Sequence, residues 1–508
     1  MPKLKDCRPK ARTYKEAKGL DYTTTIAHTY QYHTYPDTHS TTSLLFSLIM
    51  VLARYGDAII PEDAELLGQS LQMPFSGRVA KSRFFKGATS ERLASWHSKD
   101  LSTRGVPSDD LVRLYEAWGK AGYGILVTGN VMVDPEELEA PGNAILYEPH
   151  ETPERIEQFR KMAAAGKAHG SLMIMQVSHG HQLAVLMGSS AVGSGASDTQ
   201  PADRIGSFRK PTVLDKAGIR KVVDQFAYTA EAAYRAGFDG IQLHWAHGYL
   251  IDQSLSQTTN NRTEDYGGSI KNRSRFIKEL INAIRAKVPD RKFVIGMKVN
   301  SVEFQAKGLQ ACLFPEEAAE LCEQLEALEI DFVELSGGTY EKKALMHSDS
   351  GARESTLKRE AFFAEFTQQV APWINRAVVY ITGGFRSASG MAKAIRDGAC
   401  AGVGLGRPAA SDLALPNEII QKGVTGATKI NFSSDDFTLS ILAAQLQMLE
   451  LVQGRPVIDL SDPQEVARFQ EFVPQYLQEQ TQKLEEGLYN PRIVHGSLPT
   501  RARNSVEL

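Results

Sequence analysis

Cysteine is scarce in this sequence, which has only four among its 508 residues: Cys7, Cys312, Cys322 and Cys400. No two of them stand in a C-x-x-C pair. The scarcity and the scattered spacing argue against a disulfide framework, an iron–sulfur cluster and a structural zinc site. We therefore expect a protein without bound metal in a reducing compartment, the cytoplasm.

Long hydrophobic runs and a strong excess of one charge are also missing. The most apolar stretch, SLLFSLIMVLA at residues 43–53, is too short to span a bilayer and lies too far from the start for an ordinary signal peptide. The formal net charge is −3 and no basic block stands out. Neither a membrane nor a nucleic acid is therefore expected as a partner, whereas a small-molecule substrate is, and a homo-oligomer is compatible with this composition.

The first 65 residues differ in composition from the rest. Thr, Tyr and His cluster in YTTTIAHTYQYHTYPDTHSTT, residues 22–42, just before the apolar run. We interpret residues 1–65 as an N-terminal extension that is either disordered or an incorrectly joined start of the coding sequence. No function is assigned to it.

From about Leu67, short apolar segments alternate with amphipathic segments of helical length, a pattern typical of parallel β-α units. One such helix precedes Phe238 and is expected to end at Gly237. Strands are expected at residues 83–88, 123–129, 171–178, 239–244, 292–299, 331–337, 377–384 and 401–406. Because no early strand is followed by a G-x-G-x-x-G turn, eight units over residues 66–415 predict a closed (β/α)₈ barrel rather than an open sheet. Residues 416–508 are expected to form a loop and then helices packed on the barrel.

The stretch GIQLHWAHGYLIDQ, residues 240–253, places three polar rings at the end of an expected strand and just after it: His244, His247 and Tyr249. The carboxyl ends of barrel strands face the active-site mouth, so these side chains are expected there. Taken alone, H-x-x-H is also compatible with two structural histidines or with half of a zinc site, although no third ligand is evident as a motif.

Residues 236–276 resemble the signature of the old yellow enzyme family. The likeness continues through KSRFFKGATSERLA, ILVTGNVMVD, IMQVSHGHQ, IGMKVN, ITGGFRSA and GVGLGRPAASD, and so covers residues 67–415. The resemblance implies FMN at the mouth of a (β/α)₈ barrel, reduced by NADH or NADPH. It also implies hydride transfer from flavin N5 to the alkene of an α,β-unsaturated carbonyl compound.

The same resemblance implies roles for the three rings. His244 and His247 match the pair that binds the substrate oxygen, where preorganised donors stabilise developing negative charge. Tyr249 matches the general acid that protonates the α carbon.

The residues matching the flavin site lie at the ends of the other strands. In strands seven and eight, glycines let the backbone approach the phosphate and an arginine can pair with it. The complete set expected to bind the cofactor is Ala88, Thr89, Ser90, Gly129, Gln176, Lys298, Gly383, Gly384, Gly406 and Arg407.

Three positions depart from the family pattern. Lys298 stands where many members have arginine, yet it keeps a cation beside flavin N1. Thr89 is an unusual residue in the first strand, and the SHGHQ loop offers His181 where an arginine is more frequent. Two alternatives therefore stay open: a flavin-dependent dehydrogenase or dienoyl reductase with another substrate, and a flavin-binding protein that has lost turnover.

Overall fold

A closed barrel of eight parallel strands forms the centre of the protein. The computed structural model describes residues 53–56, 58–180, 213–257, 259–300, 315–336, 374–432, 436–489 and 491. Each barrel strand pairs with the next one along the chain, and β12 pairs with β3 to close the ring. The barrel strands are β3 (Phe84–Lys86), β4 (Ile125–Val127), β7 (Leu172–Ser178), β8 (Gly240–Trp245), β9 (Val294–Asn300), β10 (Phe332–Ser336), β11 (Val378–Thr382) and β12 (Gly402–Leu405). All eight expected strands and the (β/α)₈ barrel are confirmed.

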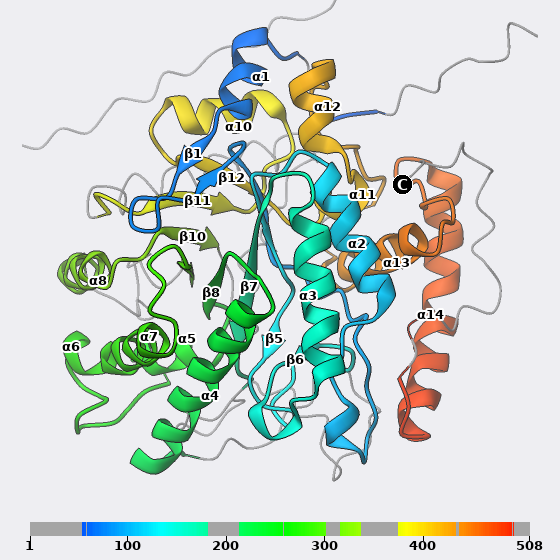
Figure 1. Ribbon diagram of the computed structural model, residues 1–508. Helices are drawn as coiled ribbons and strands as arrows, with labels where there is room; N and C mark the ends of the chain where they lie inside the picture. The colour runs from blue at the N-terminus through cyan, green and yellow to red at the C-terminus, as the bar shows by residue number, and fades with distance from the viewer. Residues whose placement is uncertain are drawn as a thin grey trace, which may run out of the picture. The chain divides into compact units, whose positions relative to one another are not determined.

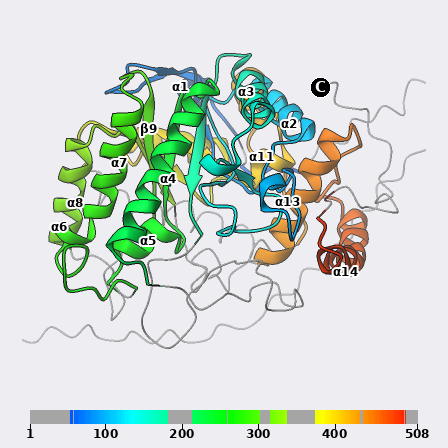
Figure 2. The same cartoon turned by 60° about the horizontal axis from the view of Figure 1, so that its bottom comes forward.

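Helices surround these strands, as Figures 1 and 2 show. Side-chain caps at Ser108, Thr152 and Asp215 begin three of them by accepting hydrogen bonds from otherwise unpaired backbone N–H groups. The helix of the third β-α unit ends at Arg235, and Gly237 follows with φ of 83°, as the sequence predicts. In the described part of the chain, the helices between barrel strands are α2 (Asp109–Lys120), α3 (Pro153–Lys167), α4 (Lys216–Arg235), α5 (Leu250–Leu255), α6 (Ile270–Arg273), α7 (Arg275–Lys287), α8 (Pro315–Ala327) and α10 (Ala388–Arg396).

Shorter elements close the barrel at its amino end and extend its loops. Asp331, just before β10, accepts hydrogen bonds from the backbone N–H groups of Phe75 and Ser76. These two residues lie in the hairpin that joins residues 71–72 to residues 79–80, so Asp331 ties this hairpin to the barrel. These elements are α1 (Pro61–Gly68), β1 (Leu71–Gln72), β2 (Val79–Ala80), the 3-10 helices η1 (Leu101–Thr103) and η2 (Glu148–His150), β5 (Val131–Met132) and β6 (Ala144–Ile145).

The barrel interior changes from apolar to polar along the strands. The rings of Phe85, Phe332 and Tyr380 pack together with centroids 4.8–6.0 Å apart in the lower layer. Two residues further along their strands, the chain presents Gly87, Glu334 and Thr382 instead. Because side chains two apart on a strand share a face, a polar layer lies above an apolar floor, at the carboxyl end of the barrel.

The C-terminal region adds helices beside the barrel (Figure 1). Helix α13 (Phe437–Val452) packs against α2 and against α11 (Pro408–Ser411), and α14 (Pro463–Glu485) follows. The loop expected directly after residue 415 is instead a helix, α12 (Leu415–Lys422). Pro416 in its first turn and Gly423 in the left-handed conformation after its end explain why this short polar segment is helical.

Residues 1–52 of the expected N-terminal extension lie outside the described residues. Arg54 donates to the carbonyl of Gly426 and pairs with Glu418 at 2.9 Å. Among the helices that the structure describes, none is long and apolar enough to cross a membrane.

Candidate active site

The three polar rings lie together at the carboxyl end of β8. His244 belongs to the strand, His247 lies in the turn after it, and Tyr249 is the N-cap residue of α5. His247 has φ of 62° and Gly248 has φ of 81°. A non-glycine residue in the left-handed region costs conformational energy and is often found at functional sites. This sharp turn brings His247 and Tyr249, three and five positions after His244, back beside it.

Each histidine is held by a serine from another barrel strand. His244 Nδ1 lies 3.1 Å from the Oγ of Ser178, the last residue of β7. His247 Nε2 lies 3.1 Å from the Oγ of Ser336, the last residue of β10. The two rings are 5.5 Å apart and nearly perpendicular. The Nε2 atom of His244 is buried and has no hydrogen-bond partner among the described residues, so it can bind a ligand atom.

Both imidazoles are neutral near physiological pH. Burial lowers the pKa of His244 well below its usual value, and the nearby His247 and Lys298 lower it further. Burial, together with Lys298, lowers the pKa of His247 to about 3. A neutral imidazole has one N–H donor, so the pair can donate hydrogen bonds without carrying charge.

The phenol of Tyr249 is buried and held by an amide. Asn130 Nδ2 lies 3.1 Å from the Tyr249 hydroxyl and 2.9 Å from Glu139 Oε2. Because a carboxylate only accepts hydrogen bonds, the Asn130 nitrogen must face Glu139 and therefore donates to the phenol oxygen. The ring also packs with Met132, Leu138 and Ile145.

Gln176 and Lys298 are joined by two residues that the sequence did not single out. Gln176 Nε2 donates to Gln242 Oε1 at 2.7 Å, and Gln242 Nε2 donates to Glu334 Oε2 at 2.7 Å. Lys298 Nζ lies 3.4 Å from Glu334 Oε1. A signal for Glu334 exists, since it is a carboxylate that directly follows and precedes apolar residues in the strand FVELS.

The loops after β3 and β4 place the next expected residues. Ala88 packs against the barrel interior, and the buried Oγ1 of Thr89 has no hydrogen-bond partner in the described part of the chain. The hydroxyl of Ser90 donates to Glu139. A Cβ at Gly129 would lie 2.0 Å from Glu91 Oε2, so this carboxylate accounts for the glycine. A flavin contact at these positions stays a prediction.

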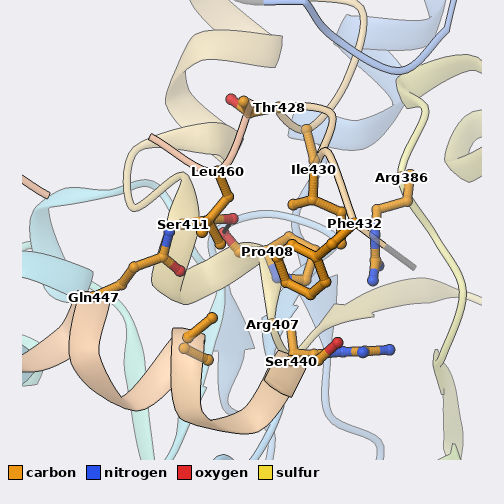
Figure 3. Close-up of a pocket in the computed structure, with 13 residues that line it drawn as sticks. Arg386, Arg407, Pro408, Ser411, Thr428, Ile430, Phe432, Ser440, Gln447 and Leu460 are labelled. Atoms are coloured by element: carbon orange, nitrogen blue, oxygen red, sulfur yellow. Dashed lines mark hydrogen bonds between the residues drawn. The ribbon is translucent and has the colours of Figure 1, made fainter. Parts of the chain in front are cut away.

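The loops after β11 and β12 carry the residues expected to bind the phosphate. Gly383 and Gly384 have φ of 150° and 75°, which favours glycine. Among the described residues, a Cβ at Gly406 would meet only Thr89 Cγ2, at 4.0 Å, so these residues leave space for a ligand there. Figure 3 shows Arg386 and Arg407 at one pocket.

That pocket has a volume of about 30 Å³ and is completed by the C-terminal region. Ser440 and Gln447 from α13 line it, as does Phe432 (Figure 3). The sequence did not indicate that α13 reaches these loops.

Other expected features fall elsewhere. His181 and the rest of the loop from residue 181 to residue 212 lie outside the described residues. In the described part of the chain, no three His, Cys, Asp or Glu side chains gather closely enough to hold a metal ion. The two histidines of H-x-x-H are held by serines.

The polar groups at the carboxyl end of the barrel have the hydrogen-bonding chemistry that a flavin nucleotide requires. Unpartnered buried polar atoms at His244 and Thr89, an open position at Gly406 and two arginines surround the carboxyl end of a closed barrel. An aromatic heterocycle with a phosphate tail needs amide and cationic groups at one end and glycine-rich backbone at the other. The arrangement is typical of flavin-dependent oxidoreductases.

Comparison with known proteins identifies the family. The model of the NADH:flavin oxidoreductase / NADH oxidase family matches residues 94–425. An NADH-dependent flavin oxidoreductase from Aspergillus parasiticus is 37% identical over 448 residues, which cover 88% of this chain and 98% of that protein. Another from Hypocrea jecorina is 32% identical over 362 residues, covering 68% of this chain and 86% of the relative. The chain belongs to this family, that of the old yellow enzymes, and is an oxidoreductase.

Solved structures confirm the fold. The old yellow enzyme homologue from Zymomonas mobilis superposes with a TM-score of 0.54 at 19% identity, covering 72% of this chain and 95% of that chain. Morphinone reductase in complex with tetrahydroNAD gives a TM-score of 0.53 at 18% identity, covering 72% and 92%.

Proposed function

We propose that this oxidoreductase binds FMN at the barrel mouth and uses NADH or NADPH to reduce the alkene of α,β-unsaturated carbonyl compounds. The observation that carries the proposal is the convergence of two neutral imidazoles and one phenol, with the buried Nε2 of His244 unpartnered among the described residues. Family membership supports the flavin and NADH. Cytoplasmic location and the possible homo-oligomer stay predictions from the sequence.

The cofactor would be held from three sides. Gln176 and Lys298 would bind the pyrimidine edge of the flavin, while Ala88, Thr89, Ser90 and Gly129 would line it from the loops after β3 and β4. Gly383, Gly384, Gly406 and Arg407 would bind the phosphate. When bound, FMN would take a hydride from the nicotinamide and pass it to the β carbon of the alkene.

His244 and His247 would bind the substrate carbonyl oxygen. Negative charge grows on this oxygen as the β carbon receives hydride, so N–H donors already in place stabilise the transition state more than the ground state. Neutral imidazoles suit this task because each can donate a hydrogen bond to the oxygen and still keep its own proton. The serines Ser178 and Ser336 keep both rings oriented.

Tyr249 would protonate the α carbon. Its oxygen accepts from Asn130, so a donor is already in place to stabilise the phenolate that forms when the proton leaves. Solvent then restores the proton. General acid help of this kind usually contributes roughly 10²–10⁴ in rate.

The test separates the two half-reactions by anaerobic mixing of flavin-loaded protein first with NADH or NADPH and then with 2-cyclohexenone. Tyr249→Phe should leave flavin reduction nearly intact and slow reoxidation by the enone by roughly 10²–10⁴. Tyr147→Phe, which alters another ring packed in the same cluster, is the matched control.

Three outcomes would contradict the proposal. Equal slowing of both half-reactions by Tyr249→Phe would remove this residue as the proton donor. A wild-type flavin that neither nicotinamide reduces would indicate lost turnover. A flavin that is reduced but not reoxidised by enones would favour a dehydrogenase or dienoyl reductase with another substrate.

A further inference from the structure

A single carboxylate organises the polar layer at the top of the barrel interior. Glu334 is fully buried, and its two oxygens have different partners: Lys298 at 3.4 Å and the amide of Gln242 at 2.7 Å. Gln242 in turn accepts from Gln176. A Cβ at Gly87, which follows β3, three strands away around the barrel, would lie only 3.5 Å from Glu334 Oε1. The carboxylate therefore reaches into the barrel, beneath the proposed flavin site.

The fold alone does not require a charge at this position. The layer below is apolar, and burying a carboxylate is unfavourable unless it is paired and hydrogen-bonded. A hydrophobic residue would complete the apolar strand without this cost. The pairing with Lys298 thus points to a role in the chemistry of the site.

We propose that Glu334 is a positioning residue that sets the reduction potential of the bound flavin through Lys298. The proposal rests on the proposed FMN site. Reduced flavin carries negative charge, which a lone buried cation would stabilise strongly. Glu334 offsets most of that cation's field, so the reduced flavin is stabilised less and gives up its electrons more readily.

The same carboxylate orients Gln176. Because Glu334 only accepts, Gln242 must turn its NH₂ group toward Glu334 and its carbonyl toward Gln176. Gln176 then donates one N–H to Gln242. This hydrogen bond also sets the orientation of its carbonyl oxygen and its second N–H. Both groups proposed at the pyrimidine edge, Lys298 and Gln176, are therefore fixed by one residue.

The experiment is a measurement of the flavin midpoint potential, without any alkene, in wild type, Glu334→Gln, Lys298→Met and the double variant. Glu334→Gln keeps the size of the side chain and one oxygen that can accept from Gln242, but it removes the charge. It should raise the potential, with at least a tenfold higher ratio of reduced to oxidised flavin, or about 30 mV for a two-electron couple. Lys298→Met should lower the potential, and the double variant should lie near wild type.

Controls separate this effect from loss of a buried carboxylate in general. Glu450→Gln removes a buried carboxylate that accepts a hydrogen bond from Ile458 in the C-terminal region, and it should leave the potential unchanged. Glu334→Asp keeps the negative charge, so its flavin potential should stay close to that of wild type. This holds even if thermal stability falls in all Glu334 variants. A purely structural role would lower stability without moving the potential.

An unchanged or lowered potential in Glu334→Gln overturns the inference, as does a shift in the same direction for both single variants. Failure of the proposed function looks different: the four potentials would show the expected order, but enones would not reoxidise the flavin. Protein that binds no flavin would overturn both.

Discussion

The rings of His244 and Tyr249 lie side by side, with centroids 4.1 Å apart and planes inclined by 34°. One ring comes from the end of β8 and the other from the first residue before α5, and the left-handed turn at His247 and Gly248 joins them. In the proposed reaction, a carbonyl oxygen bound by the imidazole would have the phenol close to its α carbon, where the proton is to be delivered.

Asn130→Ala should slow the oxidative half-reaction through Tyr249. The lost N–H bond to the developing phenolate is worth about 1.5–3 kcal/mol, or roughly 10- to 150-fold in rate. Rapid mixing with 2-cyclohexenone measures this in the wild-type and Tyr249→Phe backgrounds. If Asn130 acts through the phenol, its loss should matter little once Tyr249 is Phe. An equal loss in both backgrounds would contradict this role.

His244→Ala should slow enone reduction roughly 10²–10³-fold, because it removes about 2.7–4 kcal/mol of transition-state stabilisation. Rapid mixing of the reduced enzyme with 2-cyclohexenone measures this rate.

Reoxidation of the wild-type enzyme by the enone should show no histidine titration between pH 5.5 and 8, because the lowered pKa values of His244 and His247 keep both rings neutral there. The pH profile of that step is the measurement. A change in rate centred near the ordinary pKa of histidine would show that the reaction uses a charged imidazole.

Arg407→Ala should weaken FMN binding and spare riboflavin binding. A hydrogen bond to a charged group contributes about 1.5–3 kcal/mol, so the dissociation constant for FMN should rise roughly 10- to 150-fold. Fluorescence titration of the apoprotein with both flavins gives the two constants. If riboflavin affinity falls by the same factor, Arg407 does not bind the phosphate.

Acid should destabilise the protein through its buried histidines. Burial lowers the pKa of His179 to about 4 and that of His247 to about 3, whereas the unfolded chain takes up these protons near 6.5. Below that pH the unfolded state binds more protons, so the free energy of unfolding falls as pH drops from about 6.5 to 4, by up to about 1.4 kcal/mol per pH unit for each residue. Denaturant unfolding at pH 7, 6 and 5 checks this. His179→Gln should show a shallower dependence, and an unchanged slope would exclude His179 as a contributor.

The barrel could be predicted from the sequence because each β-α unit carries its own signals. The segment from residue 331 to residue 337 is short, apolar and rich in strand-forming side chains, and Gly237 marks a helix end by its conformational freedom. Such signals act over a few residues and need no knowledge of distant contacts. His244, His247 and Tyr249 could be expected at the mouth for the same reason, since they lie at the end of a strand and in the turn after it.

The interactions of these residues required the tertiary structure. The partners of His244, Tyr249 and Lys298 are Ser178, Asn130 and Glu334, between 36 and 119 positions away along the chain. Glu334 could have been noted as a carboxylate in an apolar strand, but its pairing with Lys298 depends on the register of β9 and β10. The sequence determined which chemical groups stand at the strand ends. Barrel closure decided which of them meet, because only strand register and a shared buried interior set the distances over which charges and hydrogen bonds act.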